Sequence, residues 1–429
     1  MGFFGKNRKI IQIVGFLLEK TFQIFVFLIP SQLALHFWPK WAFVYGIRID
    51  YLAPSIYFSD ILILIIFFLW LMEFLLNSRS IKFIKSSLYL IPLLILAILN
   101  IGFATNYYLA IYKWLKFVEL ILLGIFIIQY KKFEIKKWIV QPLSFSIIFF
   151  VIIGLIQFVR RETIGGALYF LGERTFSIYT PGIALVELFG RQLMRTYSTF
   201  PHPNSLAGFM GISILLISFC GKRINRNIYY SAILFALLGI LISFSKTVLL
   251  TLCIIGIIWL LTKKLKIENI VGRLTLILLI VGSILLLMLR INVLTPRVNN
   301  IENIYQRISL IDTSREIIKA KPFFGVGFGN FIINIPNYSQ DNSWILQPVH
   351  NIYLLLFTET GLAGIIIFFI LFVKVVDKTN SLRKRNSLYL LLFILLTGFF
   401  DHYWLSIQQN LLLEVIVFAM ILREDINFT

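Results

Sequence analysis

Long apolar runs alternate with short polar connections along almost the whole chain. Twelve runs approach the roughly 20 mostly apolar residues that a membrane-spanning helix needs. Their approximate centres are Phe27, Leu64, Leu94, Leu120, Ile148, Gly211, Phe235, Ile254, Ile280, Ile365, Leu392 and Leu413. The seventh and eighth form one patch from Ile228 to Leu261, which holds two spans only with a tight turn near Ser245; otherwise the number is eleven. The pattern predicts an all-α integral membrane protein in which residues 1–429 form a single polytopic domain.

Basic residues mark every second connection between these runs. The basic connections hold Lys6, Arg8, Lys9; Arg79, Lys82, Lys85; Lys131, Lys132, Lys136, Lys137; Lys222, Arg223, Arg226; Lys263, Lys264, Lys266; and Lys374, Lys378, Arg383, Lys384, Arg385. Because lysine and arginine are enriched in cytoplasmic loops, both termini are predicted inside. The other connections include two large loops, residues 160–203 and 290–350, which are predicted to lie outside the cytoplasmic membrane.

Composition agrees with a membrane protein. Hydrophobic residues make up 59% of the chain and charged residues only 14%, whereas a soluble domain has about 25% charged residues. The net charge of +20 is explained by the topology signals, so membrane lipids rather than nucleic acid are the expected surroundings. Cys220 and Cys253 imply neither a disulfide framework nor a metal motif. The first run lacks a small-residue cleavage site and is predicted to stay as a span.

The first large loop ends in charged residues at helical spacing. The segment Gly182–Arg195 is predicted to be a short helix, and its charges share one face because they recur every four residues. These charges are Glu187, Arg191 and Arg195. The helix either lies at the membrane surface with its charges in water or directs the two arginines inward to hold an anion. An extended turn then leads into the next span through Pro201, Pro203 and Asn204.

The second large loop contains an amphipathic helix that ends before Pro322. Its apolar face is formed by Ile304, Ile308, Ile311, Ile317 and Ile318. Arg307 and Arg315 are eight residues apart and share a side of this helix. The sequence GVGFG at 325–329 is not a dinucleotide-binding fingerprint, because no strand–turn–helix surrounds it, and it is predicted to be a turn of close backbone approach.

His350 is the strongest catalytic candidate, because it ends the second loop at the start of a span and an unperturbed histidine titrates near pH 6.5. A histidine at a helix start is also a common structural cap. Glu359 lies inside the following span, where a carboxylate is costly and usually functional or partnered. The remaining polar candidates are Lys246, Asn351, Asp401 and His402. The sequence shows neither a D-x-D pair nor a His/carboxylate cluster outside the membrane, which argues against a divalent metal.

Several of these stretches resemble the O-antigen ligase and O-antigen polymerase superfamily. The stretches are RTYSTFPHPNSLAGF, the segment from Arg307 through KPFFGVGFGNF to HNIYLLLFTETGLAG, and DHYWLSIQQ. Together they extend over residues 195–409. The chain departs from the family where Ser198 replaces a frequent glycine, Lys246 replaces an arginine, and Ile311 replaces a tryptophan.

The resemblance implies a metal-independent glycosyltransferase without cofactor. Such an enzyme takes a glycan from a polyprenyl-diphosphate carrier at the outer leaflet and passes it to a hydroxyl of lipid A core, another glycan, a protein or a wall polymer. Arg195 and Arg307 would hold the diphosphate, with Arg191, Lys246 and Arg315 in second rank. His350 would act as the general base and lose activity below about pH 6.5. Supporting residues would be Asn204, Asn351, Glu359 and His402.

Two alternatives remain open from the sequence. Within the same superfamily, the protein could be a repeat-unit polymerase rather than a ligase, and nothing in the chain separates the two. From a different class, a transporter or flippase would also suit twelve spans with both ends inside. Transporters, however, concentrate polar residues and broken helices at the midplane and carry repeats. Here the polar candidates gather at the predicted outer face and no repeat is visible, which favours the glycosyltransferase.

Overall fold

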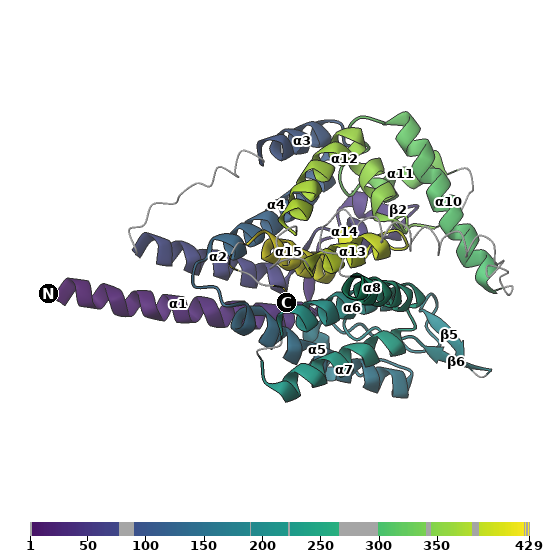
Figure 1. The fold of residues 1–429 in the computed structure, drawn as a ribbon. Coiled ribbons are helices and arrows are strands. Elements are labelled where there is room, and N and C mark those ends of the chain that lie inside the picture. The colour runs from purple at the N-terminus through teal and green to yellow at the C-terminus, as the bar shows by residue number, and fades with distance from the viewer. Residues whose placement is uncertain are drawn as a thin grey trace.

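The computed structural model describes residues 2–76, 90–188, 190–221, 224–265, 299–339, 345–379, 386–423, 425 and 428. These parts are mostly helical, and Figure 1 shows helices stacked over nearly the whole molecule. Seven described helices are long and apolar enough to cross a membrane. They are Lys9–Leu28, Phe58–Leu76, Lys136–Arg160, Pro203–Cys220, Arg226–Ser243, Lys246–Lys264 and Ile352–Lys378.

The helices follow most of the predicted runs. They are α1 (Gly2–Leu28), α2 (Phe58–Leu76), α3 (Leu90–Gly102), α4 (Tyr107–Gln129), α5 (Gln141–Arg160, preceded by the π-helical turn Lys136–Val140), α6 (Pro203–Cys220), α7 (Arg226–Ser243), α8 (Lys246–Lys264), α10 (Asn299–Ala320), α11 (Phe331–Tyr338), α12 (Ile352–Lys378), α13 (Ser387–Gly398), α14 (Tyr403–Ser406) and α15 (Gln408–Leu422). The run centred on Ile280 lies outside the described residues.

Within the described residues the strands are short and pair as three antiparallel ribbons. They are β1 (Ala34–His36) with β4 (Ser55–Tyr57), β2 (Phe43–Val44) with β3 (Ile47–Arg48), and β5 (Leu185–Leu188) with β6 (Arg191–Met194). They are accompanied by 3₁₀ turns at Lys40–Ala42, Asp50–Leu52 and Gly166–Leu171.

The first span begins earlier than its apolar run suggested. Phe27 lies beside the end of α1 rather than at the centre of a span. The helix tolerates charge in its middle because Lys137 places its Nζ 2.8 Å from Oε2 of Glu19. In α4, which covers the run around Leu120, Lys113, Lys116 and Glu119 interrupt the apolar sequence. That helix is accordingly absent from the seven candidate spans, and α3, α13 and α15 are shorter than a full span.

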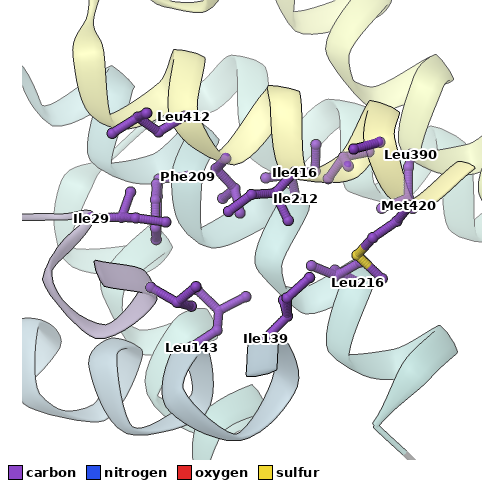
Figure 2. Packing of buried hydrophobic residues seen from close by; sticks show 14 of the residues in the cluster. Ile29, Ile139, Leu143, Phe209, Ile212, Leu216, Leu390, Leu412, Ile416 and Met420 are labelled. Atoms are coloured by element: carbon purple, nitrogen blue, oxygen red, sulfur yellow. The ribbon is translucent and has the colours of Figure 1, made fainter. Parts of the chain in front are cut away.

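One large hydrophobic core joins helices from both halves of the chain. Figure 2 shows buried side chains of the α5, α6, α13 and α15 segments pointing toward one another, together with Ile29 at the end of α1. Phe209, Ile212 and Leu216 of α6 lie at the centre of this packing. Because α6 is buried over most of its surface, its N-terminus is held in a fixed position, and the candidate site lies there.

A second core gathers segments that the sequence leaves far apart. Residues 42–52 pack there with α10, α11, Val349 and Leu355. In Figure 1 the ribbon containing β2 lies close to α10 and α11, far from the N-terminus of α1. This packing brings the segment between α1 and α2 to the beginning of α12, beside His350.

Helix α12 is broken at Gly361, where φ is +67°. The loop that follows α10 inserts its backbone into this break: the N–H of Val326 donates to the carbonyl of Thr358 at 2.9 Å, and the N–H of Leu362 donates to the carbonyl of Pro322 at 2.8 Å. The GVGFG sequence is therefore a site of close backbone approach, as predicted. A side chain at 361 would meet the carbonyl carbon of Phe323, so only glycine fits.

The helix expected at Gly182–Arg195 is wrong. This segment forms the β5–β6 hairpin, in which Glu187 lies opposite Gln192 and Leu188 opposite Arg191. Gly190 has φ +73° and supplies the positive φ that a two-residue hairpin loop requires. Local turn chemistry thus overrides the four-residue spacing of the charges. Glu187 and Arg191 are exposed on the hairpin, whereas Arg195, just beyond it, is half-buried.

Candidate functional site

Three histidines and an aspartate meet at a small cavity of about 50 Å³. The four residues are His202, His350, Asp401 and His402. His202 precedes α6, His350 precedes α12, and the Asp401–His402 pair lies between α13 and α14. Tyr51, from the segment between α1 and α2, lines the same cavity. The site therefore combines residues from four distant parts of the chain.

Asn351, and not His350, caps helix α12. Its Oδ1 accepts from the N–H groups of Tyr353 and Leu354, each at 2.9 Å. Its Nδ2 donates to the carbonyl of Phe399 at 3.2 Å, which ties the start of α12 to the end of α13. This contact joins the two segments that carry His350 and Asp401. It also removes the capping role that the sequence left open for His350.

The imidazole of His350 carries a buried nitrogen with unused hydrogen-bonding capacity. Its Nδ1 is buried and has no hydrogen-bond partner among the described residues. Burial lowers the pKa of His350 to about 3, the charge of Asp401 opposes this effect, and His402 and Arg307 reinforce it. The imidazole is therefore neutral at physiological pH. The unperturbed pKa assumed from the sequence does not apply.

Asp401 anchors the cluster. Its Oδ2 accepts from Nδ2 of Asn204 at 2.8 Å, and its Oδ1 accepts from the backbone N–H of His402, also at 2.8 Å. Burial alone would raise the pKa of Asp401, but the adjacent His402, His350 and His202 and the Asn204 hydrogen bond hold it below its ordinary value. The carboxylate consequently stays ionised, and it favours positive charge on the histidines around it.

Arg195 connects to this carboxylate through Asn204. Its Nε donates to the carbonyl of Ser243 at 2.7 Å, and its Nη2 donates to Oδ1 of Asn204 at 2.6 Å. The same amide then donates to Asp401. Arg307 approaches from α10, where its Nη1 lies 3.4 Å from the carbonyl of Phe400. Two of the predicted arginines thus flank the histidine–aspartate cluster.

The second-rank cations lie elsewhere. Arg191 is exposed on the β5–β6 hairpin, Lys246 is exposed at the first position of α8, and Arg315 pairs with Asp312 at 2.7 Å on the exposed side of α10. Glu359 is buried at the break in α12, where its Oε1 accepts from the N–H of Phe331 at 3.4 Å. It holds the start of α11 and does not line the cavity.

Three residues near the site escaped the sequence analysis. Tyr51 comes from a connection that carried no chemical signal, and its ring packs edge-on against His402 at 5.5 Å. His202 precedes Pro203 and Asn204, a pattern typical of a helix N-cap, and its Nδ1 accepts from the N–H of Asn204 at 3.1 Å. Arg174 donates to the carbonyl of Pro201 at 2.5 Å, and nothing in the sequence distinguishes it from other loop cations.

The cluster also has the composition of a metal site. The potential ligand atoms of His350, Asp401 and His402 all lie within 4.8 Å of one another. This corrects the expectation that the polar loops lack a His/carboxylate cluster. Sequence spacing could not reveal it, because position 350 is far from the adjacent pair 401–402 along the chain.

Residues 231–369 match the family model described as O-antigen ligase. This part of the chain is similar to the O-antigen ligase family. The matched region runs from α7 into α12 and includes Arg307, His350 and Glu359, whereas Asp401 and His402 lie beyond it. No curated protein matches the chain. This similarity and the apolar helices together indicate an integral membrane protein. The family implies an enzyme of the ligase or glycosyltransferase type, whose partners in general are a lipid-linked glycan and an acceptor.

Proposed function

We propose that the protein transfers a glycan from a polyprenyl-diphosphate carrier to a hydroxyl acceptor at the outer face of the cytoplasmic membrane. The observation that carries this proposal is the buried Nδ1 of His350, which has no partner among the described residues and belongs to a residue that lines the cavity. A neutral imidazole with an available nitrogen is suited to accept a proton.

In the proposed reaction the imidazole of His350 is the general base. The acceptor hydroxyl gives its proton to His350 while its oxygen attacks the anomeric carbon of the donor glycan. The bond between that carbon and the phosphate oxygen breaks, and the polyprenyl diphosphate leaves with the electron pair. Asp401 stabilises the imidazolium that forms, since its charge raises the pKa of His350. Attack from one side inverts the anomeric centre, so no covalent glycosyl-enzyme is needed.

Arg195 and Arg307 are the proposed partners of the diphosphate. Both flank the cluster, and guanidinium groups bind phosphate oxygens through two parallel N–H donors. Their positive charges stabilise the leaving diphosphate as charge develops on it. Arg191, Lys246 and Arg315 keep a second-rank role in this proposal, since they are exposed and do not line the cavity.

This mechanism proceeds without a metal ion, although the cluster composition suits one. Both carboxylate oxygens of Asp401 already accept hydrogen bonds. In addition, the positive charges of Arg195 and Arg307 act on His202, and that of Arg307 acts on His350 and His402. The same charges would repel a divalent cation and attract the diphosphate.

The proposed placement outside the membrane is supported by where the site residues occur. Tyr51, His202 and His350 all lie in connections that the lysine and arginine pattern assigns to the outer side, and the Asp401–His402 pair lies at the corresponding end of α13. A cysteine at Ser339 should react with an impermeant thiol reagent in intact cells, while one at Asn380 should not. Reversed labelling would contradict the orientation.

The diphosphate site is tested with purified variants and a defined lipid-linked donor. Arg195→Ala and Arg307→Ala should each lower transfer at least about tenfold, because a charge-assisted hydrogen bond is worth roughly 1.5–3 kcal/mol. Lysine at either position should restore only part of the activity, since it lacks the planar guanidinium group with two parallel N–H donors. Arg160→Ala, at an exposed arginine paired with Glu162, is the matched control and should stay active. Full activity of both Arg195→Ala and Arg307→Ala would contradict diphosphate binding by these two arginines.

Deletion of the gene separates a ligase from a polymerase. A ligase defect should leave long glycan chains on the lipid carrier, because polymerisation continues without transfer. A polymerase defect should leave single repeat units on the carrier. The ligase proposal therefore predicts long carrier-linked chains, which can be measured by extraction and sizing of the lipid-linked glycans.

A further inference from the structure

The cavity beside His350 has a lining unlike that of a phosphate site. Its polar groups are neutral or negative: the phenol of Tyr51, the amide of Gln347, the hydroxyl of Ser205, the histidines and the carboxylate of Asp401. Neither Arg195 nor Arg307 lines it. A diphosphate would meet the ionised Asp401 there without a facing cation. The site therefore has two regions. The arginines lie beside the cavity, and the groups that line the cavity can hydrogen-bond a hydroxyl.

The cavity is large enough for a hydroxyl group. At about 50 Å³ it has room for a few water-sized groups. A hydroxyl or hydroxymethyl group therefore fits inside it. Any group that enters lies next to His350, the proposed base.

We propose that this cavity is the subsite for the attacking hydroxyl of the acceptor, and that Tyr51 and His202 hydrogen-bond this hydroxyl while His350 takes its proton. The inference rests on the proposed function and adds the acceptor side to it. It also assigns a role to the segment between α1 and α2, which lies outside the O-antigen ligase match at 231–369.

Tyr51 and His202 have the chemistry that this role needs. Burial raises the pKa of Tyr51, and the charge of Asp401 raises it further, so its hydroxyl keeps its proton and can donate. Burial lowers the pKa of His202 to about 4, so the ring is neutral. Its Nδ1 accepts from the N–H of Asn204, which leaves the proton on Nε2 as a donor.

Two conservative variants test the subsite. Tyr51→Phe removes one hydroxyl without changing the shape of the ring, and His202→Asn removes the second ring nitrogen while keeping a side chain that caps α6. Each variant is introduced into a strain lacking the chromosomal gene, whose own membranes supply donor and acceptor. Transfer is measured as the ratio of acceptor-linked to carrier-linked glycan. The matched control is Tyr179→Phe, at a tyrosine that is 92% exposed.

The donor side is measured separately on the purified proteins with farnesyl diphosphate as the probe. Tyr51→Phe and His202→Asn should lower transfer about tenfold or more, while their Kd for farnesyl diphosphate and their melting temperatures stay at wild-type values. Arg195→Ala and Arg307→Ala should instead weaken farnesyl diphosphate binding. The control Tyr179→Phe should match the wild type in every assay.

Two outcomes would overturn the subsite. Wild-type transfer by both Tyr51→Phe and His202→Asn would remove their role, and weakened farnesyl diphosphate binding by these variants would assign the cavity to the donor. Failure of the proposed function gives a different result: the arginine variants would then bind farnesyl diphosphate normally, and His350 variants would keep transfer.

Discussion

Two polar clusters lie along the first half of α12, and they differ in whether their hydrogen bonds are complete. At the break near Gly361, Asn100 uses its whole amide: it donates to the carbonyls of Phe324 and Glu359, both at 2.8 Å, and accepts from Trp114 at 2.8 Å and Phe328 at 2.9 Å. At the start of the helix, Nδ1 of His350 has no such partner among the described residues.

Whether the hydrogen bonds of a buried polar cluster are complete indicates whether the cluster has a structural or a chemical role. A buried polar cluster with complete hydrogen bonds rigidifies a fold, because any change leaves groups unsatisfied. A buried nitrogen beside a cavity is costly to the fold and therefore points to a ligand or a proton. Glu359 is as unusual in the sequence as His350. Its carboxylate, however, accepts a hydrogen bond from backbone, whereas Nδ1 of His350 has no partner among the described residues.

The largest expected effect on stability is at the break itself. Gly361→Ala should lower the melting temperature by at least about 5 °C, since the residue has φ +67° and its Cβ would meet the backbone of Phe323. The matched control is Gly256→Ala in α8, where an added Cβ meets nothing within 4 Å. The control should melt at or slightly above the wild-type temperature in a detergent unfolding assay. Equal melting of the two variants would mean that the break carries no strain.

A smaller loss is expected from the structural cluster. Asn100→Ala removes the partner of two N–H donors, on Trp114 and Phe328, and of the Phe324 carbonyl, at roughly 1–3 kcal/mol for each group left unsatisfied. The carbonyl of Glu359 still accepts from the N–H of Gly327. Asn100→Ala should therefore lower the melting temperature while the protein that remains folded transfers glycan at the normal rate. Asn227→Ala, at an exposed position of α7, is the control. A defect in turnover at full stability would give the Asn100 cluster a chemical role and contradict its assignment as structural.

The smallest expected change concerns pH. Protonation of His350 would remove the base, but burial lowers its pKa to about 3, so this loss begins far below pH 6.5. The pKa of Asp401 is also below its ordinary value, so its charge persists over the same range. kcat/KM, which reports the free enzyme, should change by no more than about twofold between pH 7 and pH 5.5. A tenfold loss over that interval would show an imidazole with an ordinary pKa.

The ends of helices could be predicted from the sequence where a local signal, such as a turn or a proline, determines them. The tight turn near Ser245 is confirmed by Phe244, which has φ +52° between α7 and α8. Helix α10 ends at Ala320, before Pro322, because proline cannot continue a helix. Ser198 has φ +53°, the left-handed conformation that glycine adopts most readily.

The site could be predicted only in part, because long-range contacts build it. His350, His402 and the flanking Arg195 and Arg307 were candidates by position, but the hydrogen bond from Asn204 to Asp401 joins residues 197 positions apart. No periodicity or spacing encodes such a contact. Tyr51 reaches the cavity through the packing of residues 42–52 on α10 and α11, which the sequence pattern does not indicate.

Turnover of purified His350→Asn, with a defined lipid-linked donor and acceptor in the presence of EDTA, shows whether His350 is the base of a metal-independent transfer. Asparagine would satisfy a capping role but cannot accept the proton as imidazole does, and Asn351 already caps α12. We expect unchanged transfer by the wild-type enzyme in EDTA and a loss of roughly 10²–10⁴-fold in the variant, with farnesyl diphosphate binding retained. Near-wild-type turnover by His350→Asn, or a wild-type enzyme that EDTA silences, would contradict this mechanism.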